Sequence, residues 1–163
     1  MSDTLSRSVI HLLHRANQCV GELFQAEMAG IDLTARQYII LLTVSNMQGA
    51  SQQDIIDATA IDRSTVSQVV QIMIRKGLLK RKRTREDART YAITLTDLGQ
   101  NVLQTAQPIV DRVNEAFLAA LPAAQAKMLV NSLGLIVEAS TDKPGPATTE
   151  GERQVEQPEA AVS

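Results

Sequence analysis

The stretch from Asp62 to Leu95 constrains the fold most, because helical periodicity gives way there to strand-like sequence within a few residues. Asp62 is expected to cap a helix that Gly77 ends. Apolar side chains recur on one face of this helix at the spacing i, i+3, i+4, i+7, i+8, namely Val66, Val69, Val70, Met73 and Ile74. Short polar side chains share the other face, at Ser64, Ser67, Gln68, Gln71 and Arg75.

Residues 79–84 and 91–95 favour two strands joined by the charged hairpin tip 85–89. In the second strand, Tyr91, Ile93 and Leu95 are expected to point inward. Ser51 is placed to cap a short helix over residues 52–59, and Ala60 and Ile61 form a tight connection to the next helix. A short helix, a tight turn, a capped helix and a basic hairpin together predict a winged helix-turn-helix.

Charge is concentrated in the same region. Residues 62–91 hold nine Lys or Arg against three acids, a local charge of +6, although the chain as a whole carries −2. Phosphate contacts need clustered positive charge, so this segment predicts a polyanion as partner, with a solvated basic face as the alternative. Together with the helix-turn-helix pattern, the predicted partner is double-stranded DNA.

A recognition helix reads the major groove, about 12 Å wide, with side chains that reach base edges. Gln68 is suited to a bidentate contact with adenine, and Arg63 to a phosphate. At the wing, Arg85 and Arg89 suit the minor groove, and Asp87 is expected to pair with one of them. The predicted DNA-binding residues are Ser51, Gln52, Arg63, Ser64, Thr65, Ser67, Gln68, Gln71, Lys82, Arg83, Arg85, Asp87 and Arg89.

Long helices flank this DNA-binding region, which spans residues 34–95. One is expected over residues 4–28, within an N-terminal segment 4–30, and a helix with a capping box at Thr34 and Gln37 follows it. Segment 97–140 contains a helix kinked at Pro108 and a last helix after Pro122. The apolar stripes of the flanking helices exceed what the small central domain covers, so both flanks are predicted to be dimerisation helices. Residues 141–163 are predicted to form a disordered acidic tail.

The chain resembles the MarR family of transcription regulators over about residues 8–140. The matching segments are LTARQYIILL (33–42), SQQDIIDATAIDRSTVSQVVQIMIRKGLLKR (51–81) and EDARTYAITLTDLG (86–99). The resemblance implies a mainly α fold with a small β-wing, and a homodimer that binds a pseudo-palindromic operator with its wing in the minor groove. It also implies repression that a small-molecule inducer relieves. Many relatives have arginine where this chain has Gln68, so no base preference is carried over there.

The segment VIHLLHRANQCVGELFQAE (9–27) is similar to regulators of aromatic-acid catabolism. This likeness implies an aromatic acid or its CoA thioester, of the hydroxycinnamoyl-CoA type, as inducer. His11, Arg15, Arg36 and Tyr38 are the candidate ligand-binding residues, in a cleft between the first two helices and the DNA-binding domain. A solvated Arg36 and a core Tyr38 are the competing interpretations.

Two other sensing modes stay open. His11 and His14 can bind zinc together with Cys19 or an acid, although no second thiol or carboxylate pair lies near, and no metal site or cofactor is assigned. Cys19 can act as an oxidation switch, but no cationic cluster surrounds it in sequence, and we expect it to be buried and inert.

Several classes of protein are disfavoured. No catalytic motif occurs, so an enzyme is not expected. A single cysteine, no signal peptide and no apolar run of about 18 residues predict a cytoplasmic protein with no membrane association. A DNA-architectural or interaction module without a sensing function remains the alternative on the same fold.

Overall fold

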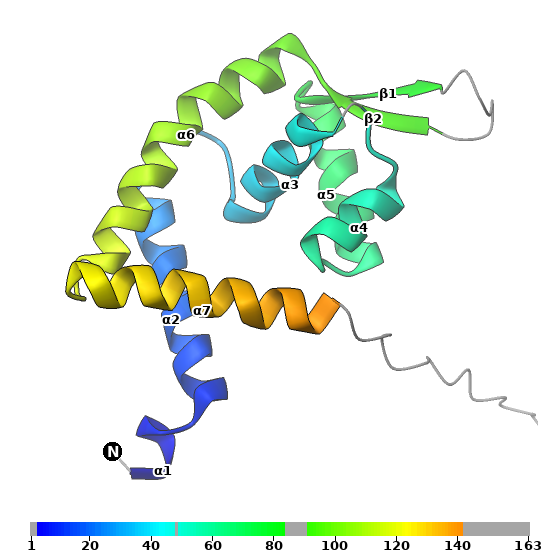
Figure 1. Cartoon of the computed structure of the whole chain (residues 1–163). Helices are drawn as coiled ribbons and strands as arrows, with labels where there is room; N and C mark the ends of the chain where they lie inside the picture. Colours follow the sequence, from blue (N-terminus) through cyan, green and yellow to red (C-terminus); the bar gives the residue numbers. More distant parts are fainter. Residues whose placement is uncertain (1–2, 48, 84–90, 142–163) are drawn as a thin grey trace, which may run out of the picture. The chain divides into compact units, whose positions relative to one another are not determined.

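The computed structural model describes residues 3–47, 49–83 and 91–141. The chain divides into two compact units, Met1–Ala120 and Leu121–Ser163. The first unit holds six helices and a two-stranded sheet among its described residues (Figure 1), in the order α1 (Asp3–Ser6), α2 (Val9–Glu27), α3 (Ala35–Asn46), α4 (Gln52–Thr59), α5 (Arg63–Arg75), β1 (Leu79–Arg83), β2 (Tyr91–Leu95) and α6 (Asp97–Leu118). The second unit holds α7 (Ala123–Thr141).

The N-terminal segment forms two helices, which corrects the single helix expected over residues 4–28. Ser8 has extended backbone angles (φ −76°, ψ 114°), and its side chain accepts a hydrogen bond from the His11 amide. A serine in this conformation is an N-cap, so α2 starts at Val9 and is separate from α1.

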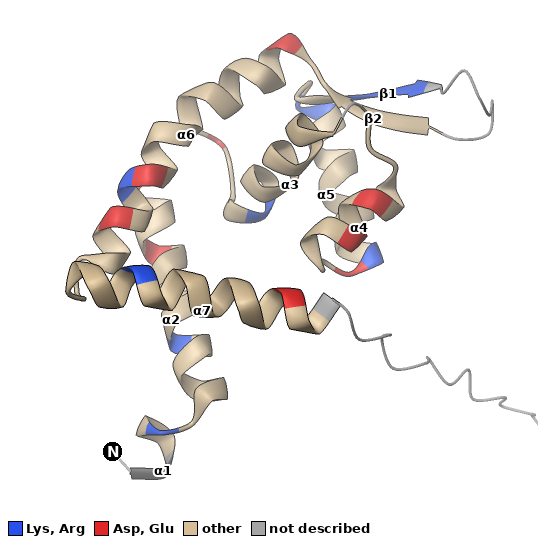
Figure 2. Ribbon diagram, in the orientation of Figure 1, with Lys and Arg blue, Asp and Glu red and all other residues tan. Residues whose placement is uncertain are grey.

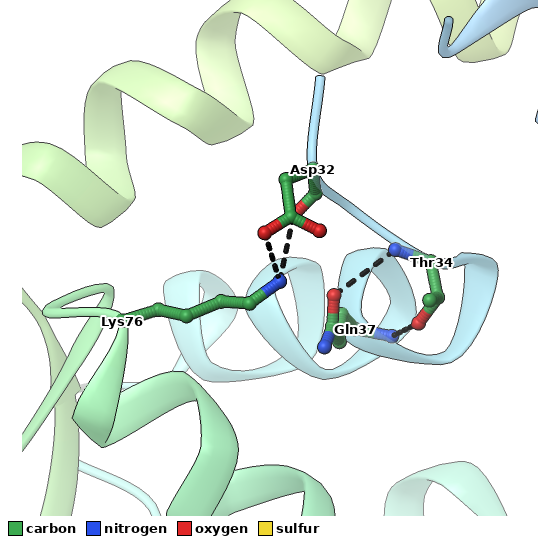
Figure 3. A network of polar contacts seen from close by, with 4 residues as sticks. All are labelled: Asp32, Thr34, Gln37 and Lys76. Atoms are coloured by element: carbon green, nitrogen blue, oxygen red, sulfur yellow. Dashed lines mark hydrogen bonds and ion pairs between the residues drawn. The ribbon is translucent and has the colours of Figure 1, made fainter. Parts of the chain in front are cut away.

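The predicted capping box at the start of α3 is confirmed. The Gln37 amide donates to Thr34 Oγ1 at 3.3 Å, and the Thr34 amide donates to Gln37 Oε1 at 3.0 Å (Figure 3). These reciprocal bonds satisfy two amides that a helix start otherwise leaves unpaired.

The predicted helix-turn-helix is also confirmed. Ser51 and Asp54 form a second capping box at the start of α4, and Asp62 caps α5 through the Thr65 amide. Between the two helices, Ala60 adopts the left-handed conformation (φ 52°, ψ 19°). This backbone geometry costs a residue with a Cβ atom about 1–2 kcal/mol.

Ala60→Gly is therefore expected to stabilise the protein. Relief of the left-handed strain exceeds the entropy that glycine adds to the unfolded chain, and the net gain is about 0.5–1 kcal/mol. The measurement is the urea midpoint of unfolding. Ala58→Gly is the matched control. Ala58 is exposed within α4, and replacing alanine by glycine inside a helix lowers the free energy of unfolding by about 1 kcal/mol. Destabilisation by both substitutions to the same extent would contradict the prediction.

The wing is an antiparallel pair of strands that lies next to α3 and α5 (Figure 1). Leu79 pairs with Leu95, and Arg83 pairs with Tyr91. Ala50 extends the pairing, because it exchanges two backbone hydrogen bonds with Ile93, at 3.1 and 2.7 Å. Ile93 is buried as expected, whereas Tyr91 is 44% exposed and does not point into the core. Tyr91 lies at the far end of the register, beyond the helices that cover Ile93.

The core of the first unit joins the helix-turn-helix, the sheet and α6. Its fully buried side chains include Ile40 and Leu41 of α3, Met73 of α5 and Val113 of α6. α6 continues through Pro108 as a single helix. Arg112 of α6 contacts the Glu27 carboxylate of α2 at 3.3 Å, and the two helices lie side by side.

Large apolar side chains remain exposed on α2 and on α7. They are Val9, Ile10, Leu12 and Leu13 on α2, and Met128, Val130, Leu133, Leu135, Ile136 and Val137 on α7. Cys19 is exposed as well, which corrects the expectation that it is buried. The N-terminal half of α2 extends beyond the part of the helix that α6 and the core cover. Among the described helices, none on its own is both long and apolar enough to cross a membrane.

Candidate DNA interface and ligand cleft

α5 presents a polar face to solvent because its apolar stripe is fixed in the core. Val66, Val70 and Met73 are buried. Exposed or half-buried polar side chains occupy the opposite face, at Arg63, Ser64, Thr65, Ser67, Gln68, Gln71 and Arg75. This helix has the form of a recognition helix, with one face held by its own domain and short donors and acceptors on the other.

Hydrogen bonds fix the first turn of α5. Asp62 Oδ1 accepts from the Thr65 amide at 2.9 Å and from the Ser64 hydroxyl. These bonds hold the pKa of Asp62 far below its usual value. Arg63 Nη2 donates to Gln53 Oε1 of α4 at 2.6 Å. Ser64 and Arg63 are thus oriented by neighbouring side chains. The Ser64 hydroxyl donates its proton to Asp62.

At α4, the two candidate residues have different surroundings. Ser51 is the N-cap: its Oγ accepts from the Asp54 amide, and its own amide donates to Asp54 Oδ2 at 2.8 Å. These bonds lower the pKa of Asp54. Gln52 Nε2 is buried without a hydrogen-bond partner among the described residues. Ser51 therefore has a demonstrated structural role besides the predicted DNA contact.

The first strand of the wing is basic and open to solvent. Lys80, Arg81 and Lys82 are exposed on β1, which is the blue strand in Figure 2. Arg83 stands in β1 opposite Tyr91. The Arg83 side chain and the tip residues Arg85, Asp87 and Arg89 lie outside the described residues.

Lys76 has a partner within the protein. Its Nζ lies 2.8 Å from the Asp32 carboxylate and donates to the Asp32 carbonyl at 3.0 Å (Figure 3). The contact ties the C-terminal end of α5 to the loop between α2 and α3. Because Asp32 is 90% exposed, we assign this ion pair a positioning role rather than a large share of the stability.

A cleft of about 640 Å³ lies between α2, the start of α3 and α5. Its apolar lining comes from Phe24, Leu33, Val69 and Ile72, and Gly21 leaves a gap in the α2 wall. Its polar lining includes Gln25, Arg36, Thr65 and Gln68. Arg36 is the one cation among the described lining residues, and it makes no hydrogen bond or ion pair with any described residue. This volume is in the range of small-molecule sites.

The structure places only Arg36 of the four candidate ligand residues in this cleft. His11 and Arg15 lie more than one helical turn before Gly21, and the Arg15 guanidinium donates to Gln18 at 3.5 Å. Tyr38 is buried: its ring lies 6.3 Å from that of Phe24, and its hydroxyl donates to Gln107 at 3.2 Å. Burial raises the pKa of Tyr38. Tyr38 is thus a core residue, the competing interpretation given above.

Sequence reasoning missed Gly21, Phe24 and Gln25 as residues of the cleft. A glycine inside a helix lowers stability by about 1 kcal/mol relative to alanine. Gly21, within the predicted helix 4–28, was therefore the one sequence signal that this part of the helix lines a cleft. Thr65 and Gln68 were predicted for DNA alone, although both also line the cleft. No group of three or more His, Cys, Asp or Glu suited to a metal ion occurs among the described residues.

The fold and the exposed polar helix define a winged-helix DNA-binding protein. The sequence model of the MarR family matches residues 31–90. Transcriptional regulator HosA of Escherichia coli O157:H7 is 30% identical over 127 residues, which are 78% of this chain and 93% of HosA. This chain therefore belongs to the MarR family of transcription regulators, which are not enzymes.

Two solved structures of regulators are similar over most of the chain. BpsR of Bordetella bronchiseptica, whose DNA binding is regulated by 6-hydroxynicotinic acid, is 27% identical with a TM-score of 0.75, covering 85% of this chain and 96% of BpsR. The repressor CouR of Rhodococcus jostii RHA1, bound to a 23-mer DNA duplex, is 27% identical with a TM-score of 0.78, covering 84% of this chain and 97% of CouR.

Proposed function

We propose that this protein is a homodimeric transcriptional repressor that releases its operator when a small organic anion binds in the cleft. The observation that carries the proposal is the cleft itself. Its apolar lining is joined by the exposed Arg36, a cation that pairs with none of the described residues, and one of its walls is the recognition helix α5.

The DNA side of the proposal uses two elements. The polar face of α5 enters the major groove, and the basic strand β1 follows the neighbouring phosphates. A two-fold dimer presents two such helices to half-sites about one helical turn apart, which matches a pseudo-palindromic operator. The exposed apolar side chains of α2 and α7 supply the surface that a second copy covers.

The ligand side rests on charge and size. A guanidinium facing an apolar cleft favours a carboxylate attached to a flat apolar group, and among the described lining residues none is acidic. Regulation of BpsR by an aromatic acid supports the same class of inducer for this chain. A CoA thioester of such an acid is the second form to test. Its phosphates would need cations at the mouth of the cleft in addition to Arg36.

Coupling follows from a population shift. The ligand binds more tightly to the conformation whose recognition helices are wrongly placed for the operator, and the affinity for DNA falls accordingly. A coupling free energy of about 1–3 kcal/mol is typical of such systems and corresponds to a loss of about 5- to 150-fold.

Fluorescence anisotropy tests the proposal directly. The DNA is the region upstream of the protein's own gene, with a scrambled duplex as control. Benzoate, 4-hydroxybenzoate, 4-hydroxycinnamate and the CoA thioester of 4-hydroxycinnamate are the candidate inducers. Selective binding that one of them reverses supports the proposal, whereas equal binding to both duplexes, or selective binding that none reverses, contradicts it.

Arg36→Met is expected to weaken binding of the aromatic acid about 10- to 100-fold, because a hydrogen-bonded ion contributes about 1.5–3 kcal/mol. Operator affinity without inducer is expected to stay within about threefold, since Arg36 is on α3 and not on the recognition helix. Isothermal titration calorimetry and anisotropy measure the two quantities.

Arg15→Met is the matched control for this variant. It removes the same charge from an exposed position on α2 that does not line the cleft, so inducer binding should stay at the wild-type value. A loss with Arg15→Met and none with Arg36→Met would place the anion elsewhere.

A further inference from the structure

Two functional surfaces meet on α5. Its solvent-facing polar side chains include Ser64, Gln68 and Gln71, spaced three or four residues apart. The side chains that line the cleft are Thr65, Gln68, Val69 and Ile72, at the same helical spacing. Two polar residues of α5 belong to both surfaces, the half-buried Thr65 and the exposed Gln68, and Gln68 is the one whose side chain is open to solvent.

The Gln68 side chain is free to serve either surface. Its carboxamide makes no hydrogen bond with any described residue. An amide offers two donors and one acceptor oxygen, so it can pair with a base edge, a hydroxyl or a ring nitrogen. A single amide cannot point its donors and its acceptor at both a base in the groove and a molecule in the cleft.

The cation and the amide enter the cleft from different helices. Arg36 comes from the first turn of α3, whereas Gln68 comes from α5, and apolar side chains of α2 and α5 contribute the lining as well. A ligand that uses both needs a carboxylate at one end, a flat apolar body, and a second hydrogen-bonding group away from the carboxylate.

We propose that Gln68 is shared between operator and inducer: it binds the second polar group of a hydroxylated or nitrogen-containing aromatic acid, and this contact withdraws it from DNA. The inference rests on the proposed function and names both the ligand class and the residue that couples the two sites. Because linkage is reciprocal, a residue used by both ligands lowers the affinity of each in the presence of the other.

Gln71 provides a matched control. It is the same residue type on the same helix, it is exposed, and it makes no hydrogen bond with any described residue, but it does not line the cleft. Gln68→Ala and Gln71→Ala therefore remove the same group from two neighbouring positions, and both are expected to stay folded because neither side chain is buried.

The first experiment compares 4-hydroxybenzoate with benzoate by calorimetry on the full chain. The wild type is expected to prefer the hydroxylated acid about 5- to 10-fold, the value of one neutral hydrogen bond. Gln68→Ala should reduce this preference to less than about twofold, whereas Gln71→Ala should retain it. A preference that survives Gln68→Ala unchanged overturns the inference, as does a wild type that binds both acids equally.

The second experiment measures how far saturating 4-hydroxybenzoate weakens operator binding. The ratio of operator dissociation constants with and without the acid is expected to be largest in the wild type and Gln71→Ala, and at least about threefold smaller in Gln68→Ala. Equal ratios in all three overturn the inference while leaving the proposed function intact. Failure of the wild type to bind or respond to any acid tested instead overturns the proposed function, and the inference with it.

Discussion

Gly99→Ala is expected to destabilise the protein by at least about 3 kcal/mol, a large part of the 5–15 kcal/mol that typically separates folded from unfolded states. A Cβ atom at residue 99 would lie 2.0 Å from the Leu78 carbonyl oxygen and 3.0 Å from the Leu78 carbonyl carbon. Both neighbours are backbone atoms, so no side-chain rotation relieves the overlap.

The surrounding hydrogen bonds make the site rigid. The Leu78 carbonyl accepts from the Thr96 amide at 3.1 Å, and Thr96 Oγ1 accepts from the Gly99 amide at 3.0 Å. Moving α6 away from Leu78 would break the N-cap of α6 and separate it from the start of the wing. Urea unfolding followed by circular dichroism measures the effect.

Gly21→Ala is the control for this prediction. Apart from the backbone of α2 itself, no atom of the described residues lies within 4 Å of a Cβ atom at residue 21, and alanine in a helix interior is more stable than glycine by about 0.5–1 kcal/mol. The two substitutions should therefore shift the urea midpoint in opposite directions. A Gly99→Ala variant as stable as the wild type would show that the contact between α6 and Leu78 yields easily.

Local signals explain why the DNA-binding region could be predicted from sequence. The capping box at Thr34 and the caps at Ser51 and Asp62 depend on residues three apart, and the stripe from Val66 to Ile74 depends on helical periodicity. Each was confirmed, because the caps are satisfied by hydrogen bonds between residues close in sequence and the stripe follows from the helical repeat itself.

A cleft was expected between the first two helices and the DNA-binding domain, but its lining and the exposure of α2 could not be predicted in the same way. Tyr38 is buried because Phe24 and Gln107 approach it from α2 and α6, and Gly21 lines a cleft only because α5 packs opposite. Cys19 is exposed although the adjacent Val20 packs against the core, because the two side chains point to different faces of α2. Such features depend on how distant segments meet, and periodicity within one helix does not encode that.

Leu13→Glu is expected to dissociate the proposed dimer at least about 100-fold, which is about 2.7 kcal/mol. Leu13 is 51% exposed and lies on the apolar stripe of α2 with Val9 and Val20, so the free chain tolerates a carboxylate there. A second copy that covers the stripe would bury the charge without a partner, and an unpaired buried charge is strongly unfavourable. Sedimentation velocity over a range of concentrations measures the change.

Operator binding is expected to fall with the dimer. One chain contacts one half-site, and loss of the second contact removes the gain from linked binding, so anisotropy should show at least about a 100-fold weaker operator complex. Gln18→Glu adds the same charge to the opposite face of α2, beside Arg15, and should leave both measurements at the wild-type value. If Leu13→Glu sediments and binds DNA as Gln18→Glu does, the stripe on α2 is not the surface that joins two copies, and the α7 side chains remain as the candidate.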